Sequence, residues 1–107
     1  MAETQIGEVK VDGTNVKIYD DSGNDTGQRL TLCNDCELSG YNSKYIVITD
    51  GTNVKIYDGD TDTGQRITLN NNGFIKKVTS SAILIKEGST IKYYDFNGND
   101  TGKRTND

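Results

Sequence analysis

A nine-residue segment that occurs three times constrains this 107-residue chain more than any other feature of its sequence. Asp12-Gly-Thr-Asn-Val-Lys-Ile-Tyr-Asp20 recurs without change 38 residues later, as Asp50 to Asp58. It returns a further 37 residues along the chain as Glu87-Gly-Ser-Thr-Ile-Lys-Tyr-Tyr-Asp95. Each copy is followed by a polar loop and then by Thr-Gly-Gln-Arg or Thr-Gly-Lys-Arg. A repeat of this period is typical of solenoids, propellers and tandem arrays.

Within each repeat, the residue pattern favours β-strands. Val16 and Ile18 alternate with Lys and Tyr, and the other copies keep this alternation, which is the period of a pleated strand. The runs Tyr45–Thr49 and Ala82–Ile85 are almost continuously apolar, which favours strands covered on both faces. Phe74–Val78 predicts a further strand. No segment keeps the period of a helix, so we expect an all-β chain in which Asp-Gly and Thr-Gly form the turns.

The order of residues within a repeat resembles a blade of the WD-repeat-like β-propellers. In that family a strand ends in Trp-Asp, and Thr-Gly-Lys and Leu follow. Here Tyr19, Tyr57 and Tyr94 stand at the Trp position, each with Asp after it, although the family's Gly-His signature is missing. The resemblance implies three tandem four-stranded antiparallel meanders that are propeller-blade-like. We treat residues 1–107 as a single repeat domain, with repeats at approximately 6–35, 36–72 and 73–107.

The strand count predicts an incomplete ring. On this register Cys36–Asn42 and Phe74–Ser80 are innermost strands, and the first repeat lacks one, so we expect three, four and four strands. Three blades cannot close, because propellers have about four blades or more. The chain should therefore form a homo-oligomer, most simply two copies giving six blades, or belong to a longer array. A β-trefoil and an open, oligomeric β-sheet assembly are the alternatives.

The composition argues against several classes of function. The chain has no His, which removes Ser-His and Cys-His activation of a nucleophile and the commonest zinc ligand. Its formal net charge is −4, whereas nucleic acids and anionic membrane surfaces select a basic patch. No apolar run approaches the ~20 residues that span a bilayer. We therefore expect a protein that is not an enzyme and that binds neither nucleic acid nor a membrane.

The loops that follow the Tyr-Asp pairs are candidate calcium sites. Asp58, Asp60 and Asp62 place three carboxylates at alternate positions of one loop, and calcium prefers about 6–8 oxygen ligands. The other two loops carry fewer carboxylates, and no bidentate Glu follows in the manner of an EF-hand. The alternative is that Asp, Asn and Gly are present because they form hairpin turns. Calcium is the one metal that the sequence predicts, and no other cofactor is expected.

A second candidate is a ligand site repeated in each unit. The three arginines of the chain occupy one repeat position, and we place them across the hairpin from Asp20, Asp58 and Asp95. Together with the tyrosines they could bind an anionic ligand or a sugar, or they could form ion pairs and pack between sheets. The candidate ligand-binding residues are Tyr19, Arg29, Tyr57, Arg66, Tyr94 and Arg104.

Cys33-Asn-Asp-Cys36 is the third candidate. The two cysteines could close a small disulfide, donate half of a zinc site or take part in redox exchange. A zinc site would need ligands from carboxylates or from another chain, because the pair supplies only two. Asn70 and Gly73 stand at the same places in the next repeat, so the fold does not need the sulfur atoms.

Taken together, these features predict a binding or scaffold module whose partner is a protein or a second copy of the chain. The alternative is a multivalent carbohydrate-binding, lectin-like module with one site in each repeat, since repetition raises avidity.

Overall fold

The computed structural model describes residues 5–70 and 72–106, and these ranges contain eleven β-strands and no helix. Within them, therefore, no helix is available to span a membrane. Residues 1–4, 71 and 107 of the predicted domain lie outside the described ranges. The expectation of an all-β chain is confirmed for the described residues.

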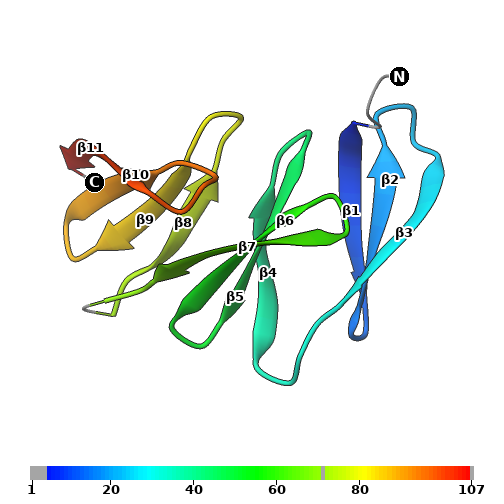
Figure 1. Ribbon diagram of the computed structural model, residues 1–107, viewed down its shortest axis with the longest axis horizontal. Coiled ribbons are helices and arrows are strands. Elements are labelled where there is room, and N and C mark those ends of the chain that lie inside the picture. The colour runs from blue at the N-terminus through cyan, green and yellow to red at the C-terminus, as the bar shows by residue number, and fades with distance from the viewer. Residues whose placement is uncertain (1–4, 71, 107) are drawn as a thin grey trace.

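The strands form three separate antiparallel sheets, which lie side by side (Figure 1). In each sheet the strands follow chain order, so the predicted counts of three, four and four strands are confirmed. The first sheet contains β1 (Ile6–Asp12), β2 (Asn15–Asp20) and β3 (Asp25–Thr31). The second contains β4 (Cys36–Tyr41), β5 (Tyr45–Asp50), β6 (Asn53–Asp58) and β7 (Thr61–Thr68). The third contains β8 (Phe74–Val78), β9 (Ile83–Glu87), β10 (Thr90–Tyr94) and β11 (Asp100–Asn106).

Two-residue turns connect equivalent hairpins in the three sheets. In the first and second sheets Asp12 pairs with Asn15 and Asp50 with Asn53, which leaves two residues for each turn. The first turn residue is a glycine with a φ of 64°, 61° or 62° in the three sheets, a conformation that glycine adopts without a steric penalty. The Asp-Gly sequences therefore form turns as predicted.

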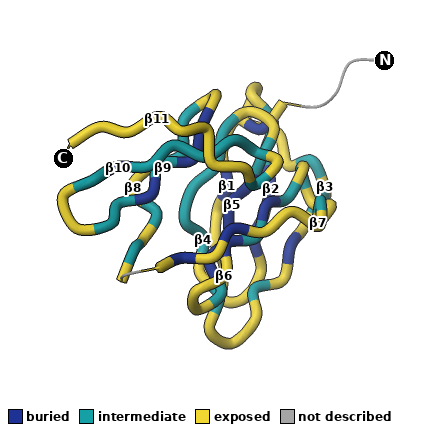
Figure 2. The backbone as a smooth tube through the Cα atoms, turned by 60° about the vertical axis from the view of Figure 1, so that its left-hand side comes forward, coloured by how far each residue is buried: buried dark blue, intermediate teal, exposed yellow. Residues whose placement is uncertain are grey.

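Two apolar clusters hold the sheets together, and the buried residues lie between the sheets (Figure 2). The cluster between the first and second sheets contains Ile6, Val9, Val16, Ile18, Leu30, Ile46 and Ile48. The cluster between the second and third sheets contains Val47, Val54, Ile56, Ile67, Leu69, Ile83 and Ile85. Successive residues of β5 enter opposite clusters because side chains alternate along a strand. The expectation that Tyr45–Thr49 is covered on both faces is confirmed.

The same expectation is only partly confirmed for Ala82–Ile85. Ile83 and Ile85 are buried against the second sheet, but Leu84 is only half-buried. It pairs with Tyr93 on the outward face of the third sheet, where no further sheet follows within the described residues. A continuous apolar run thus marks an interior strand only when a neighbour covers each face.

Polar and aromatic contacts fix how neighbouring sheets meet. The Ile6 amide donates a hydrogen bond to the Ser43 carbonyl at 2.7 Å, which ties β1 to the loop that precedes β5. The Asn42 side-chain amide, in the same loop, donates to the Thr79 carbonyl at 3.0 Å. The rings of Tyr45 and Phe96 stack with centroids 4.6 Å apart. The loop after β4 therefore contacts both neighbouring sheets.

Candidate functional site

The three arginines form bidentate ion pairs, but with a different aspartate from the one we expected. Each guanidinium bonds the carboxylate that lies four residues earlier in the same strand. The Nη1–Oδ1 distances are 2.8, 2.9 and 2.8 Å, and the Nη2–Oδ2 distances are 2.7, 2.8 and 2.6 Å. Such paired N–H bonds match the fork of the guanidinium to the carboxylate. The pairs are Asp25–Arg29, Asp62–Arg66 and Asp100–Arg104.

A β-bulge explains this choice of partner. In the second sheet the register with β6 shifts between Lys55 and Tyr57, and Gly64 has a φ of 82°. Asp62 Oδ1 accepts a hydrogen bond from the Gly64 amide at 2.8 Å, and Thr63 Oγ1 donates to the Ile56 carbonyl at 2.7 Å. The bulge brings the Asp and Arg side chains of one strand onto each other. The first and third sheets repeat these bonds.

The aspartates that we expected to face the arginines lie where the hairpin loops begin instead. Asp20 Oδ1 accepts from the Ser22 and Asn24 amides, both at 2.9 Å, and Asp95 makes the equivalent bonds in the third sheet. Asp58 lies 3.9 Å from the Lys44 ammonium. Asp20 and Asp95 therefore act as the turn formers that the alternative interpretation described, whereas Asp58 lies near a lysine.

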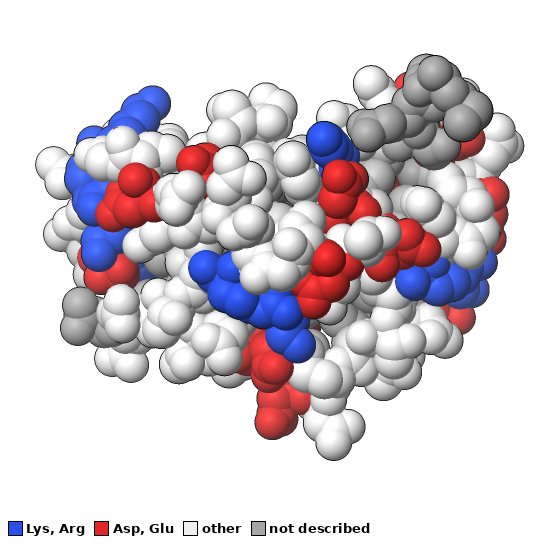
Figure 3. All heavy atoms as spheres, viewed as in Figure 1, with Lys and Arg blue, Asp and Glu red and all other residues white. Residues whose placement is uncertain are grey.

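A second ion pair spans the two-residue turn of the β1–β2, β5–β6 and β9–β10 hairpins. It joins Asp12 to Lys17 at 3.2 Å, Asp50 to Lys55 at 3.4 Å and Glu87 to Lys92 at 2.9 Å. Acidic and basic side chains consequently lie beside one another on the face shown in Figure 3. These acidic and basic side chains thus form ion pairs with one another, which leaves fewer of their hydrogen-bonding groups for a ligand.

The pKa of each paired aspartate is lowered, chiefly by the hydrogen bond from its arginine. The same bond and that from the Gly64 amide lower the pKa of Asp62 from 3.8 to about 2. The pKa values of Asp25 and Asp100 move in the same direction for the same reasons. A carboxylate that is more acidic in the folded chain stabilises the fold fully above its unfolded pKa. That stabilisation is lost as the pH falls through the folded value.

Acid should therefore destabilise the protein between about pH 4 and pH 2, the window set by the shifted pKa of Asp62. We expect Tm to fall across this window, and Asp62→Asn to reduce the fall because it removes one of three titrating pairs. Asp60→Asn, a change at an exposed residue of the same hairpin, is the matched control. Thermal melts followed by circular dichroism at several pH values measure this. Equal pH dependence in the two variants would contradict the assignment.

The predicted tyrosine and arginine residues are adjacent within each sheet, but the three tyrosines have different surroundings. Tyr57 packs against the first apolar cluster and Tyr94 against the second. Tyr19 lies on the outward face of the first sheet, with the Lys10 ammonium 5.1 Å from its ring centroid. Each tyrosine contributes electrostatically to the pKa of the arginine in its own sheet. The six residues thus form three unlike pairs, and their arginines are already bonded.

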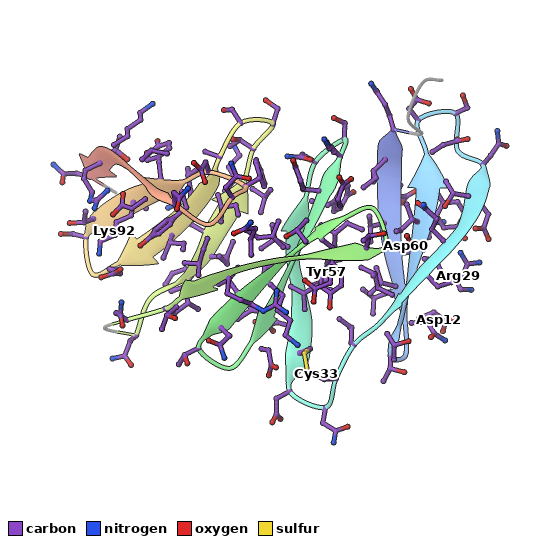
Figure 4. All side chains as sticks on the ribbon, in the orientation of Figure 1. Asp12, Arg29, Cys33, Tyr57, Asp60 and Lys92 are labelled. Atoms are coloured by element: carbon purple, nitrogen blue, oxygen red, sulfur yellow. A yellow bond between two sulfur atoms is a disulfide. The ribbon has the colours of Figure 1, made fainter. Side chains whose placement is uncertain are left out.

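The three predicted calcium ligands are not brought together. Tyr57 pairs with Asp62 and Asp58 with Thr61, so Asp58 and Asp62 point to opposite faces of the hairpin. Asp62 is also held by Arg66, and Asp60 lies in the exposed turn (Figure 4). Alternation in sequence placed them on one loop, but the register of the hairpin separates them. Calcium binding stays a prediction.

Cys33 and Cys36 form a disulfide in the turn that joins the first sheet to the second (Figure 4). The Cys36 amide donates to the Cys33 carbonyl at 3.2 Å, and the Gly73 amide makes the same bond to Asn70 at 2.8 Å in the next connection. The turn therefore forms with or without the sulfur atoms, as the comparison of the first two repeats of this chain indicated. The sulfur atoms lie beside the carboxylate of Asp50.

A cleft of about 380 Å³ lies between the second and third sheets. Its lining combines apolar side chains, two hydroxyls, one carboxylate and one aromatic ring, from Glu37, Leu38, Ser39, Thr49, Gly51, Leu69, Gly73, Phe74 and Ile75. The Ser39 and Thr49 hydroxyl oxygens are 2.5 Å apart and hydrogen-bonded. Phe74 leaves 52% of its surface exposed, more than any other large apolar residue of the described chain. Glu37 is also exposed.

Sequence reasoning missed this cleft because its walls come from strands of two different repeats. The available signal was Phe74 itself, a large aromatic residue that begins a short strand rich in lysine. Comparison of the chain with protein-family models, with curated proteins and with solved structures finds no match.

Proposed function

We propose that this chain is a non-enzymatic binding module built of propeller-blade-like β-sheets, and that its ligand occupies the cleft between the second and third sheets. The observation that carries the proposal is Phe74, a residue that is 52% exposed at a cleft that also presents Glu37 and two hydroxyls. Exposed aromatic side chains in concave sites are characteristic of recognition surfaces, because they bury a large area on binding.

The lining indicates a protein ligand. Leu69 and Ile75 offer apolar contact, while Glu37 offers a carboxylate that no described ion pair uses. A peptide segment with an apolar side chain beside a basic group would contact the apolar side chains and pair with the Glu37 carboxylate. A glycan is the second candidate, because an aromatic ring next to hydroxyl and carboxylate groups also suits a sugar. On this structure a glycan would bind at one cleft, whereas the arginines of the three repeats are already bonded to aspartates.

One selection experiment separates the two ligand classes. The protein is screened against a displayed peptide library and against a glycan array, and each selected ligand is tested on Phe74→Ala and Glu37→Gln. We expect Phe74→Ala to weaken the selected peptides at least about 10-fold, because aromatic residues in pockets dominate binding energy. Val11→Ala is the control, since Val11 is also an exposed apolar residue, at 49%, but lies in the first sheet. Ligands that bind the Phe74 and Val11 variants equally well would overturn the proposal.

We also propose that the three sheets are part of a larger assembly, formed by self-association or within a longer array. The support is that the sheets pack face to face, and that the innermost strands β4 and β8 touch at Gly40 and Val78. Separate stacked sheets also favour the blade arrangement over a trefoil. At the end of the stack, Leu84 and Tyr93 remain half-buried on the outward face.

Light scattering at micromolar concentration tests the assembly. We expect a mass of at least two chains, because a further sheet would cover the outward face of the third sheet. Leu84→Glu should shift the mass toward one chain, since it places a charge on that face, whereas Val11→Glu should not. A compact monomer for the unmodified protein rejects self-association.

A further inference from the structure

The turn between the first and second sheets gathers three side chains of a kind that bind metals. Each of Cys33, Cys36 and Asp50 offers one ligand atom, and these atoms lie within 4.8 Å of one another. No other group of three or more Cys, Asp or Glu side chains in residues 5–70 and 72–106 meets this condition. We propose that, when the disulfide is reduced, these residues bind one thiophilic divalent cation such as Zn²⁺, with the fourth position open.

The backbone brings the three ligand residues together before any metal arrives. Cys36 and Asp50 are directly paired in the β4–β5 ladder, so their side chains lie on the same face of the second sheet. The hydrogen bond from the Cys36 amide to the Cys33 carbonyl closes the turn that brings the second sulfur to them. Cys-x-x-Cys is the ligand spacing of many zinc sites, and a carboxylate is an accepted third ligand. Lys55 contacts Oδ2 of Asp50 at 3.4 Å, and the carboxylate has a second oxygen that can bind a metal at the same time.

The disulfide and the metal exclude each other, because the thiolate is the ligand and a disulfide sulfur is not. A dithiol reductant supplies two electrons and two protons: the Cys33–Cys36 bond breaks, two thiols form, and the reductant becomes a disulfide. Zn²⁺ then displaces the thiol protons to solution as the two sulfur–metal bonds form. The site is therefore redox-dependent: when a second disulfide accepts the two electrons and takes up two protons to become a dithiol, the Cys33–Cys36 bond reforms and the metal is released.

The next connection of the chain shows that these ligands are not a requirement of the turn. There Asn70 and Gly73 form the same turn, and Glu87 lies beside Gly73 as Asp50 lies beside Cys36. The acid is thus present in both connections, but the two sulfur ligands occur only in the first. The sulfur pair adds a capacity to bind metal that the fold does not need.

The test uses the full chain, reduced and kept free of oxygen, with Co²⁺ as a spectroscopic probe that Zn²⁺ then displaces. We expect one Co²⁺ per chain with a thiolate-to-cobalt charge-transfer band, and no band with the oxidised protein. Native mass spectrometry gives the stoichiometry. Asp50→Asn should weaken the metal about 10-fold or more, the range seen when groups of a metal site are altered.

Asp12→Asn is the matched control. Asp12 holds the same repeat position in the first hairpin and pairs with Lys17 as Asp50 pairs with Lys55, but it has no cysteines beside it. The control should bind Co²⁺ like the unmodified chain, and circular dichroism should show both variants folded. Equal affinity in the Asp50 and Asp12 variants overturns the proposal. A stoichiometry of one metal per two chains, held by four thiolates, also overturns it.

Discussion

Ile56→Ala should lower the free energy of unfolding by about 2–5 kcal/mol, the cost of truncating a fully buried isoleucine. Ile56 has 0% of its surface exposed and lies in the cluster that joins the second and third sheets. It pairs directly with Val47 of β5, so the lost atoms leave a cavity in the interior of the stack. Neighbouring strands are held by hydrogen bonds and cannot close such a cavity fully.

Urea denaturation followed by circular dichroism measures this loss of stability. Two further variants serve for comparison. Ile18→Ala removes the equivalent side chain in the first cluster, which is also 0% exposed, so we expect a similar loss. Val11→Ala alters a residue that is 49% exposed and should change stability by about 0.5 kcal/mol or less. Because β5 supplies both clusters, we expect one cooperative transition in each variant. Separate transitions for the two clusters would falsify this account of the packing.

Gly40→Ala should destabilise the protein by about 1–3 kcal/mol, the usual cost of inserting an atom into a packed site. A Cβ at Gly40 would lie 2.5 Å from Cγ2 and 2.9 Å from Cβ of Val78, which are closer than carbon atoms approach. Gly40 lies in β4 and Val78 in β8, so the new methyl group would push the second and third sheets apart where these two edge strands meet.

A double-mutant cycle tests whether this contact is the cause. Val78→Ala alone should destabilise the chain, because Val78 packs against the second cluster. In the double variant the closest contact, with Cγ2 of residue 78, is removed, and only the Cβ at 2.9 Å still opposes the new methyl group. The two losses should then add to less than their sum, by about 0.5–3 kcal/mol. Additive losses would mean that Gly40 is required for another reason.

The local parts of the fold could be predicted from the sequence because they depend on neighbouring residues. The alternation at Val16 and Ile18 gives the strand face, and Asp-Gly gives the two-residue turn. The strand at Phe74 ends at Val78, as the residue pattern predicted, and not at Ser80, as the propeller register implied. The partial exposure of Leu84 could not be predicted, since it depends on whether another sheet packs on that face. An apolar run carries no information about what lies beyond it.

The candidate sites were less predictable because they depend on register and on contacts between repeats. The predicted partners of the arginines were wrong, because the bulge at Gly64 changes which aspartate Arg66 contacts. Asp50 could have been found as a neighbour of Cys36 from the length of the β4–β5 hairpin. The cleft at Phe74 could not, because the packing of one sheet on the next creates it.

The bulges in the edge strands β3, β7 and β11 limit how further chains can add to this protein. The strands β3, β7 and β11 are the outer edges of their sheets, and each carries the Asp–Arg pair across a register shift. A new strand needs a straight row of free N–H and C=O groups, which a bulge interrupts and charged side chains obstruct. Strand-by-strand recruitment of other chains into a fibril is therefore opposed at these three edges. A complete sheet that stacks onto one end of the molecule does not meet this obstacle, because it packs on a face and not on these edges.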